Sequence, residues 1–263
     1  MVTVGSARVS PSYRIEALAK GLRIMSLFSS ARPRLRVKEL ADLTGYPMPT
    51  VFRLVATLEE EGYLERTPDG GVRPGIGALS LGFAALQGQD LVQVAEPLLR
   101  QLAEETGETV NLGVLIGDQV LIVARAQGSP TSLAANIRPG SRVPAVYSSI
   151  GKVLLAELSS EELAARLTKE SFTAEWGPKA VRSLPALAAQ LEGARADGFL
   201  VQEEEAIPGL SSLAAPIREL GGTTVAGLNV AVPSGRYGRS RLVAALRDPV
   251  LQTCFAISRR LGG

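Results

Sequence analysis

The chain has 263 residues, 46% of them hydrophobic and 21% charged, with a formal net charge of +2, which is the composition of a globular protein long enough for two domains. It contains 0 histidines and 1 cysteine, which excludes histidine-dependent nucleophilic catalysis, an intrachain disulfide and every multi-cysteine zinc site. Because no apolar run is long enough for a membrane span and the N-terminus lacks the apolar core of a signal peptide, we expect a cytoplasmic protein without membrane contact.

Positive charge is concentrated near the start of the chain. Up to Ile76 there are 11 basic and 8 acidic residues, whereas the acidic residues exceed the basic ones by 1 in the remainder. Such an excess suits contact with phosphate groups. On charge alone, an ordinary solvated surface explains it equally well.

The first 75 residues predict three helices. Apolar residues at near-helical spacing favour a helix over residues 15–29, which Pro33 ends. A second helix fits "RVKELADLTG", with Gly45 at its C-terminal end. The third begins at Pro49, whose missing N–H costs nothing in a first helical turn. Its core-facing residues are Val51, Leu54, Val55 and Leu58, and Thr50, Arg53 and Thr57 lie mostly on the opposite side.

The second and third helices, joined by a tight glycine turn, have the layout of a helix-turn-helix. The stretch "YLERTPDGGVRPG" then predicts a hairpin, so residues 13–75 form a winged helix-turn-helix. A generic hairpin with solubilising arginines is the alternative for this segment alone. We expect contact with double-stranded DNA from Arg36, Pro49, Thr50, Arg53, Thr57, Arg66 and Arg73.

The third helix carries one arginine, Arg53, followed by the acidic run Glu59, Glu60 and Glu61. A recognition helix reads bases with its N-terminal residues, so glutamates at the far end need not approach phosphates. Arg53 pairs either with a guanine or with a phosphate, and the sequence does not choose between them.

Residues 76–89 predict a nearly uncharged linker helix, which we expect to be buried against a partner chain. From residue 90 to residue 263, helices alternate with hairpin-joined strands, which indicates an α+β architecture. The predicted helices cover residues 91–106, 150–157, 161–167, 185–196 and 240–261, and the predicted strands 109–116, 119–126, 199–205, 211–220 and 223–232.

One catalytic spacing occurs in this second region. Ser149 and Lys152 form the S-x-x-K pattern of penicillin-binding proteins, but the K-T-G partner motif is absent from the chain. There is also no P-loop and no complete GxGxxG sequence. We therefore expect neither an enzyme nor a cofactor nor a metal, and a Ser-Lys hydrolase is kept only as a minor alternative.

The same segment suits ligand binding better than catalysis. The residues around the start of the predicted helix are Tyr147, Ser148, Ser149 and Ile150, and free N–H groups at a helix N-terminus attract a carboxylate. Leu210, Ser212 and Asn229 would supply an apolar wall with a few polar groups. Alternative partners for a carboxylate are Arg125, Arg138 and Arg142.

Four stretches occur in a fixed order: "LRVKELADLTGYPMPTVFRLVATLEEEGYLE", "GETVNLGVLIGDQVLIVARA", "PGSRVPAVYSSIGKVLLAEL" and "DGFLVQEEEAIPGLSSLAAPI". Together they resemble the IclR family of bacterial transcription regulators. The resemblance implies a winged helix-turn-helix followed by a GAF/PAS-like effector-binding domain. Carried over by position, it implicates Ser149, Ile150, Gln202, Leu210, Ser212, Asn229 and Ala231 in the effector pocket.

The segments "GLRIMSLFS" and "RVPAVYSSIGKVLLA" are most similar to the branch that responds to protocatechuate and hydroxybenzoates. The resemblance therefore implies a small organic acid effector, an aromatic carboxylate. Two positions depart from the family pattern, because Ser212 stands where many members have cysteine and Gln202 where an acidic residue is common. Either change would alter the choice of effector.

The leading hypothesis is a homodimeric or dimer-of-dimers regulator that binds a palindromic operator and whose DNA affinity changes when the effector binds. The second hypothesis is a small-molecule sensor whose winged helix contacts a protein instead of DNA. The sequence leaves open whether binding to the operator activates or represses transcription.

Overall fold

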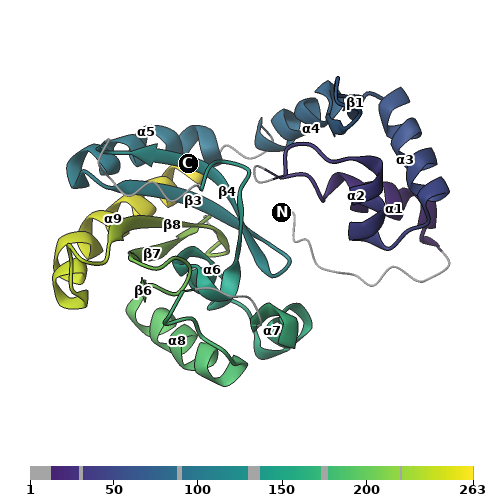
Figure 1. The fold of residues 1–263 in the computed structure, drawn as a ribbon. Coiled ribbons are helices and arrows are strands. Elements are labelled where there is room, and N and C mark those ends of the chain that lie inside the picture. The colour runs from purple at the N-terminus through teal and green to yellow at the C-terminus, as the bar shows by residue number, and fades with distance from the viewer. Residues whose placement is uncertain are drawn as a thin grey trace. The chain divides into compact units, whose positions relative to one another are not determined.

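The computed structural model describes residues 13–29, 32–87, 91–129, 137–172, 177–219 and 221–262. The chain folds as two compact units, residues 1–88 and residues 89–263 (Figure 1). The predicted end of the linker helix, residues 88–89, and the last residue of one predicted strand, Leu220, lie outside the described residues.

The first unit consists of helices followed by a small hairpin. Its helices are α1 (Glu16–Met25), α2 (Val37–Thr44), α3 (Met48–Glu60) and α4 (Ile76–Gln87), and β1 (Leu64–Arg66) pairs antiparallel with β2 (Val72–Pro74). A common core joins α1, α2, α3 and the hairpin, built from Ile24, Leu40, Val51, Val55, Leu64 and Val72. The predicted winged helix-turn-helix is confirmed, because three helices packed on one core precede the hairpin.

The predicted extent of the first helix is wrong. α1 ends at Met25 because the next N–H groups bond three residues back, from Leu27 to Ile24 over 3.1 Å and from Phe28 to Met25 over 3.4 Å. The apolar residues that suggested this helix are only partly covered: Leu18 and Leu22 are 59% and 61% exposed, and Met25, Leu27 and Phe28 are partly buried against the core. The fully buried residue is Ile24, which was not among them.

The second unit is built on one antiparallel sheet of six strands in the order β5-β4-β3-β8-β7-β6. The strands are β3 (Thr109–Ile116), β4 (Gln119–Gln127), β5 (Arg142–Pro144), β6 (Leu200–Glu203), β7 (Leu210–Arg218) and β8 (Thr224–Pro233). Five of them match predicted strands. β5 was not predicted, because three residues are too few to show a periodicity.

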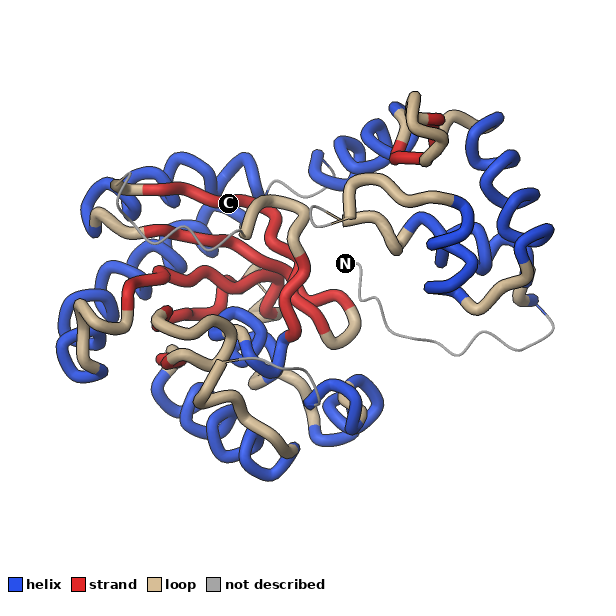
Figure 2. Tube along the Cα trace, viewed as in Figure 1, coloured by secondary structure: helices blue, strands red, loops and turns tan. Residues whose placement is uncertain are grey.

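Helices cover both faces of this sheet, as Figure 2 shows in blue against red strands. α5 (Leu91–Thr106) and α9 (Arg239–Leu261) pack on one face, and α6 (Ser149–Leu155), α7 (Ser160–Arg166) and α8 (Leu184–Asp197) belong to the core on the other. Two short 3-10 turns, Ala145–Tyr147 and Lys169–Phe172, complete the second layer. The predicted α+β architecture is therefore present.

Strand β8 shows how the sequence assigns residues to the two faces. Leu228, Val230 and Val232 belong to the core beneath α5 and α9. Because side chains alternate along a strand, the intervening Asn229 and Ala231 point to the α6 face. Each bulky apolar residue thus faces the two long helices, and a polar or small one faces α6.

Glycines bring α6 close to the sheet. Gly113 and Gly227 are register partners on β3 and β8, and a Cβ on either would lie 3.3 Å or 3.0 Å from the Ile150 side chain. A Cβ on Gly151 would lie 2.2 Å from the carbonyl oxygen of Ala145. These close approaches fix the first turn of α6, with Ser149 and Ile150, directly against the middle of the sheet.

No helix in the described ranges is both long and apolar enough to cross a membrane.

Candidate functional site

The turn between α2 and α3 is shaped by one glycine and one proline. Gly45 ends α2 with a left-handed φ of 72° and donates its N–H to Ala41 over 2.8 Å. Pro47 is the extended residue before α3, and Pro49 occupies the first turn. The turn directs α3 away from α2 as a helix-turn-helix requires.

The outer side of α3 presents the predicted DNA-contacting residues. Pro49, Arg53 and Thr57 are exposed and Thr50 is half-buried, while Val51 and Val55 are fully buried against the core. The Thr57 hydroxyl donates to the carbonyl of Arg53 over 3.0 Å. At the start of α2 Arg36 is exposed, and its backbone N–H donates to the Glu39 carboxylate over 2.6 Å.

The two wing arginines are paired within the chain. Arg66 lies 2.7 Å from the Glu59 carboxylate, and Arg73 forms an ion pair with Glu65 on the facing strand. The sequence did not reveal these pairings, which partly neutralise the wing. Since exposed ion pairs contribute about 1 kcal/mol or less, Arg73 can exchange Glu65 for a phosphate at little cost, whereas the Glu59 partner of Arg66 is half-buried.

The second candidate site is a pocket between the sheet and the start of α6. Its floor follows the strand register. One row runs from Gln202 through Ser212 and Ala231 to Thr109, and the next pairs Asn229 with Asn111 and Asn111 with Arg125. The lining residues come from strands, from α6 and from neighbouring loops: Thr109, Asn111, Ile122, Arg125, Ile137, Val143, Ser148, Ser149, Ile150, Gln202, Ala206, Ile207, Leu210, Ser212, Asn229 and Ala231.

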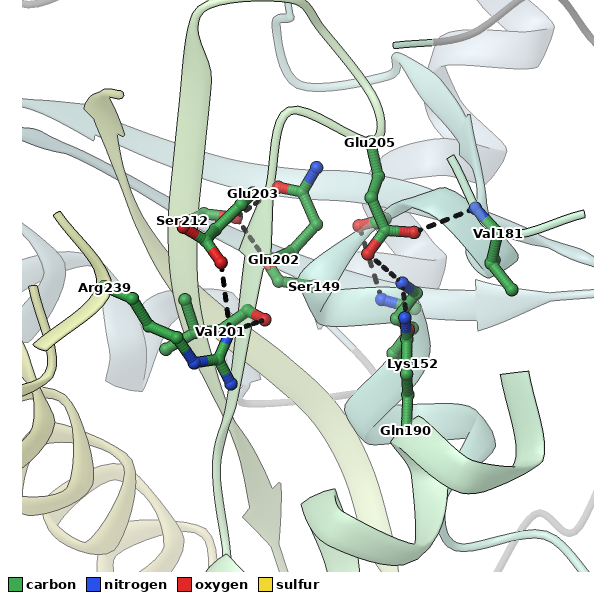
Figure 3. A network of polar contacts seen from close by, with 12 residues as sticks. Ser149, Lys152, Val181, Gln190, Val201, Gln202, Glu203, Glu205, Ser212 and Arg239 are labelled. Atoms are coloured by element: carbon green, nitrogen blue, oxygen red, sulfur yellow. Dashed lines mark hydrogen bonds and ion pairs between the residues drawn. The ribbon is translucent and has the colours of Figure 1, made fainter. Parts of the chain in front are cut away.

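A buried chain of polar side chains crosses this floor. Asn111 Nδ2 donates to Asn229 Oδ1 over 2.9 Å, Asn229 Nδ2 donates to Ser149 Oγ over 3.0 Å, and Ser149 Oγ lies 2.7 Å from Ser212 Oγ. Gln202 on β6 continues the chain beyond Ser212 (Figure 3). Its amide is best oriented with nitrogen toward Ser212 Oγ at 3.1 Å and oxygen toward the N–H of Ala206 at 2.9 Å.

This chain of hydrogen bonds leaves one serine hydroxyl proton and one amide oxygen unused. Ser149 Oγ accepts from Asn229, and Ser212 Oγ accepts from Gln202. The hydrogen bond between the two serines uses one hydroxyl proton of their two, which leaves the other proton to donate. Among the described residues, the buried Asn111 Oδ1 has no hydrogen-bond partner. The pocket therefore offers a hydroxyl donor and an amide acceptor to a ligand.

Arg125 supplies positive charge at the edge of the pocket. Its guanidinium donates to the carbonyl of Ile137. Burial, together with the nearby Arg138, lowers the pKa of Arg125, but an arginine stays charged at any ordinary pH. The enclosed space is only about 40 Å³, enough for a few water molecules.

Beneath the pocket, Lys152 on α6 forms a buried ion pair with Glu205 (Figure 3). Lys152 Nζ also donates to Gln190, and Val181 N–H donates to the Glu205 carboxylate over 3.2 Å. This argues against the Ser-Lys hydrolase alternative, because the Lys152 ammonium group donates to Glu205 and Gln190 and is not available as a base for Ser149. The described residues also contain no group of three or more side chains suited to a metal ion.

The structure brings together eight of the nine effector residues proposed from the sequence: Ser148, Ser149, Ile150, Gln202, Leu210, Ser212, Asn229 and Ala231. Tyr147 is not among the lining residues and is packed in the core beside α6, 1% exposed. Of the three alternative arginines, Arg125 lines the pocket, while Arg138 and Arg142 are exposed side chains outside it.

Sequence reasoning missed Asn111, the central acceptor of the pocket. An asparagine inside the apolar strand "TVNLGVLI" was the available signal, since a buried polar side chain needs partners. The expected helix N-terminus is weaker than predicted. α6 has only 7 residues, and its Gly151 N–H is already capped by Ser148 Oγ over 3.3 Å.

Comparison with known proteins settles the family. Residues 17–68 match the IclR helix-turn-helix domain, and residues 83–259 match the C-terminal domain of the bacterial transcriptional regulator IclR. The chain belongs to the IclR family. This IclR-family protein is a transcriptional regulator with a DNA-binding helix-turn-helix domain and is not an enzyme.

Its curated relatives are named as regulators. It is 34% identical to the HTH-type transcriptional regulator BhcR of Paracoccus denitrificans, over 97% of this chain and 90% of that protein. It is 30% identical to the Pca regulon regulatory protein of Pseudomonas putida, over 89% of this chain and 83% of that protein.

Solved structures of the family share its fold. An IclR family regulator from Brucella abortus has a TM-score of 0.78 at 26% identity, covering 96% of this chain and 94% of that one. An IclR homologue from Microbacterium hydrocarbonoxydans, complexed with 4-hydroxybenzoate, has a TM-score of 0.75 at 25% identity, covering 93% and 98%.

Proposed function

We propose that this regulator binds double-stranded operator DNA with the outer side of α3 in the major groove and the wing on the phosphate backbone. The proposal rests on Arg53, which is exposed on α3 and has no ion-pair partner in the described part of the chain. Arg36 at the start of α2 and Arg66 and Arg73 on the wing add phosphate contacts. Pro49, Thr50 and Thr57 complete the surface.

A gel shift with the fragment upstream of its own gene tests this. We expect the wild-type protein to bind this fragment more tightly than a scrambled fragment, and Arg53→Ala to lose that preference. Glu60→Ala serves as the control, because Glu60 is exposed at the far end of the same helix. Wild-type binding no tighter than to the scrambled fragment supports the second hypothesis instead, a winged helix that contacts a protein.

We further propose that a small hydroxy carboxylate binds in the pocket and changes the affinity for the operator. The observation that carries this is the matched set of unused groups, a serine proton and the Asn111 acceptor, beside the Arg125 cation. A carboxylate would accept from the serine and pair with Arg125, and a hydroxyl group would donate to Asn111. Ser148 and Gln202 would complete the polar side, and Ala231 would line the pocket between them and Thr109.

An aromatic hydroxy acid is the first candidate for the effector. One structural relative is complexed with 4-hydroxybenzoate, and Ile122, Ile137, Ile150 and Leu210 give the pocket an apolar wall. A short-chain hydroxy acid is the second candidate. It is favoured by the small enclosed space of about 40 Å³, because a smaller acid needs less rearrangement of the lining side chains.

Thermal-shift measurements separate these candidates. A panel of protocatechuate, hydroxybenzoates and short-chain hydroxy and keto acids is added at increasing concentration. A ligand at a hundredfold excess over its Kd stabilises the folded protein by about 2.7 kcal/mol. The aromatic assignment is dropped if only short acids shift the melting temperature, and the carboxylate assignment is dropped if no acid does.

Two serine variants test whether the acid binds in this pocket. Ser212→Ala removes a member of the polar chain, so we expect the affinity for the active acid to fall at least tenfold. Ser211→Ala is the matched control, because Ser211 is equally buried but points to the opposite face of the same strand. Equal affinities for the two variants would place the effector elsewhere.

We also propose that the regulator acts as a homodimer or a dimer of dimers. The supporting observation is the apolar surface left exposed within the first unit, with Leu18 and Leu22 on α1 and Leu79 and Leu81 on α4 each more than half exposed. A dimer would match a palindromic operator. Analytical ultracentrifugation that finds only monomers at micromolar concentration would contradict it.

A further inference from the structure

The recognition helix α3 has an exposed apolar ridge that its assigned polar contacts do not use. Phe52 is 57% exposed and Met48 is 48% exposed. The two residues are four positions apart, so their side chains lie together on one side of the helix. Neighbouring exposed apolar side chains form a patch, and a patch on a functional surface suits contact with a partner.

The ridge lies beside the one cation of this helix. Arg53 follows Phe52 directly and is exposed, whereas the glutamates begin six residues after Arg53, at Glu59. The first two turns of α3 are therefore apolar with a single positive charge. A partner suited to them carries negative charge next to small apolar groups.

The major groove of DNA has this chemistry. Phosphates line its edges, and each thymine projects a C5-methyl group into it. Hydrogen-bonding groups on this part of α3 are few, because Thr50 is half-buried and the Thr57 hydroxyl donates to a backbone carbonyl. Hydrogen bonds alone therefore leave the helix with little means to distinguish base pairs.

We propose that Phe52, supported by Met48, reads thymine in the operator by packing against C5-methyl groups in the major groove. The inference rests on the proposed binding of DNA through α3 and adds to it a specificity-determining residue. Arg53 holds the helix on the phosphates or on a guanine, and Phe52 selects the neighbouring A·T pairs.

Thymine methyl groups can be removed without changing base pairing. The fragment upstream of the gene is amplified with either dTTP or dUTP, so that uracil replaces thymine throughout the copied strands. The affinity of the full-length protein for both fragments is measured by fluorescence anisotropy at one fixed salt concentration, alongside a scrambled thymine fragment.

The wild-type protein is expected to bind the uracil fragment about fourfold more weakly for each methyl group that Phe52 covers. Phe52→Ala is expected to bind the thymine fragment about tenfold more weakly than the wild type and to bind both fragments equally. Phe255→Ala is the matched control, since Phe255 is 65% exposed on α9 in the other unit, and it should behave as the wild type.

Each other result overturns a defined claim. If the wild type prefers its own thymine fragment to the scrambled one but binds uracil DNA equally well, Phe52 does not read methyl groups and the regulator proposal survives. If Phe52→Ala still loses affinity on uracil DNA as the wild type does, the methyl groups act through DNA shape and the inference fails. If the wild type shows no preference for its own fragment, both proposals fail together. Urea unfolding of Phe52→Ala checks that the core beneath α3 is unchanged.

Discussion

Replacing Glu205 by leucine is expected to lower the free energy of unfolding of the effector-binding unit by about 3–5 kcal/mol. Lys152 is 0% exposed, and its ammonium group has two side-chain partners, Glu205 and Gln190. Removing the carboxylate leaves a buried positive charge beside one neutral amide. A typical domain is stable by about 5–15 kcal/mol, so the variant would lose a large part of its stability.

The double variant Lys152→Met and Glu205→Leu tests the reason. With both charges gone no buried ion is left unpaired, so most of the lost stability should return. Glu96→Gln, which breaks the exposed pair with Arg100 at 3.4 Å, is the control and should change the stability by less than about 0.5 kcal/mol.

Urea unfolding followed by circular dichroism at neutral pH measures these differences, and raising the pH adds a second test. Burial lowers the pKa of Lys152 more strongly than Glu205 raises it. Between that lowered pKa and the pKa of about 10.4 in the unfolded chain, the unfolded state binds more protons, so the free energy of unfolding rises with pH. The rise should be steeper in Glu205→Leu and absent in the double variant. A single variant as stable as the wild type, or a double variant as unstable as the single one, would refute the reasoning.

Three further predictions concern packing, pH and DNA. Gly151→Ala should unfold the second unit or destabilise it by several kcal/mol, because its Cβ would lie 2.2 Å from the Ala145 carbonyl oxygen. The control Gly193→Ala, which has open space around it on α8, should stabilise the unit by about 0.5–1 kcal/mol. Equal urea midpoints for the two variants would contradict this. Burial raises the pKa of the Cys254 thiol. Above the unfolded pKa of about 8.5 the thiol ionises in the unfolded chain only, so the free energy of unfolding of the wild type should fall by about 2 kcal/mol more than that of Cys254→Ala between pH 8 and pH 10. Parallel pH profiles of the two proteins in urea titrations would show that the thiol ionises freely. If Arg53 contacts a phosphate, Arg53→Ala should reduce the slope of log affinity against log salt by about 1; an unchanged slope with relaxed base preference in anisotropy titrations would assign Arg53 to a guanine.

The sequence was sufficient for the type and order of the elements of the first unit, though not for the end of α1, because their signals are local. The 3.6-residue spacing of Val51, Leu54, Val55 and Leu58 defines the inner side of α3. Gly45 and Pro47 define the turn before it through their own backbone preferences. The exposure of Leu18, Leu22 and Phe52 was not predictable in this way, because the same apolar residues satisfy a helical pattern whether or not the fold covers them.

The pocket needed the tertiary structure. Alternation along β8 shows that Asn229 points away from Leu228 and Val230, but it cannot show what Asn229 meets. The hydrogen bond from Asn111 to Asn229 joins residues 118 positions apart, and that between Ser149 and Ser212 joins residues 63 apart. Such pairs depend on strand order and register, which long connections leave open. The sequence thus determined which side chains are polar on each strand, and only the fold decided which of them form hydrogen bonds with one another.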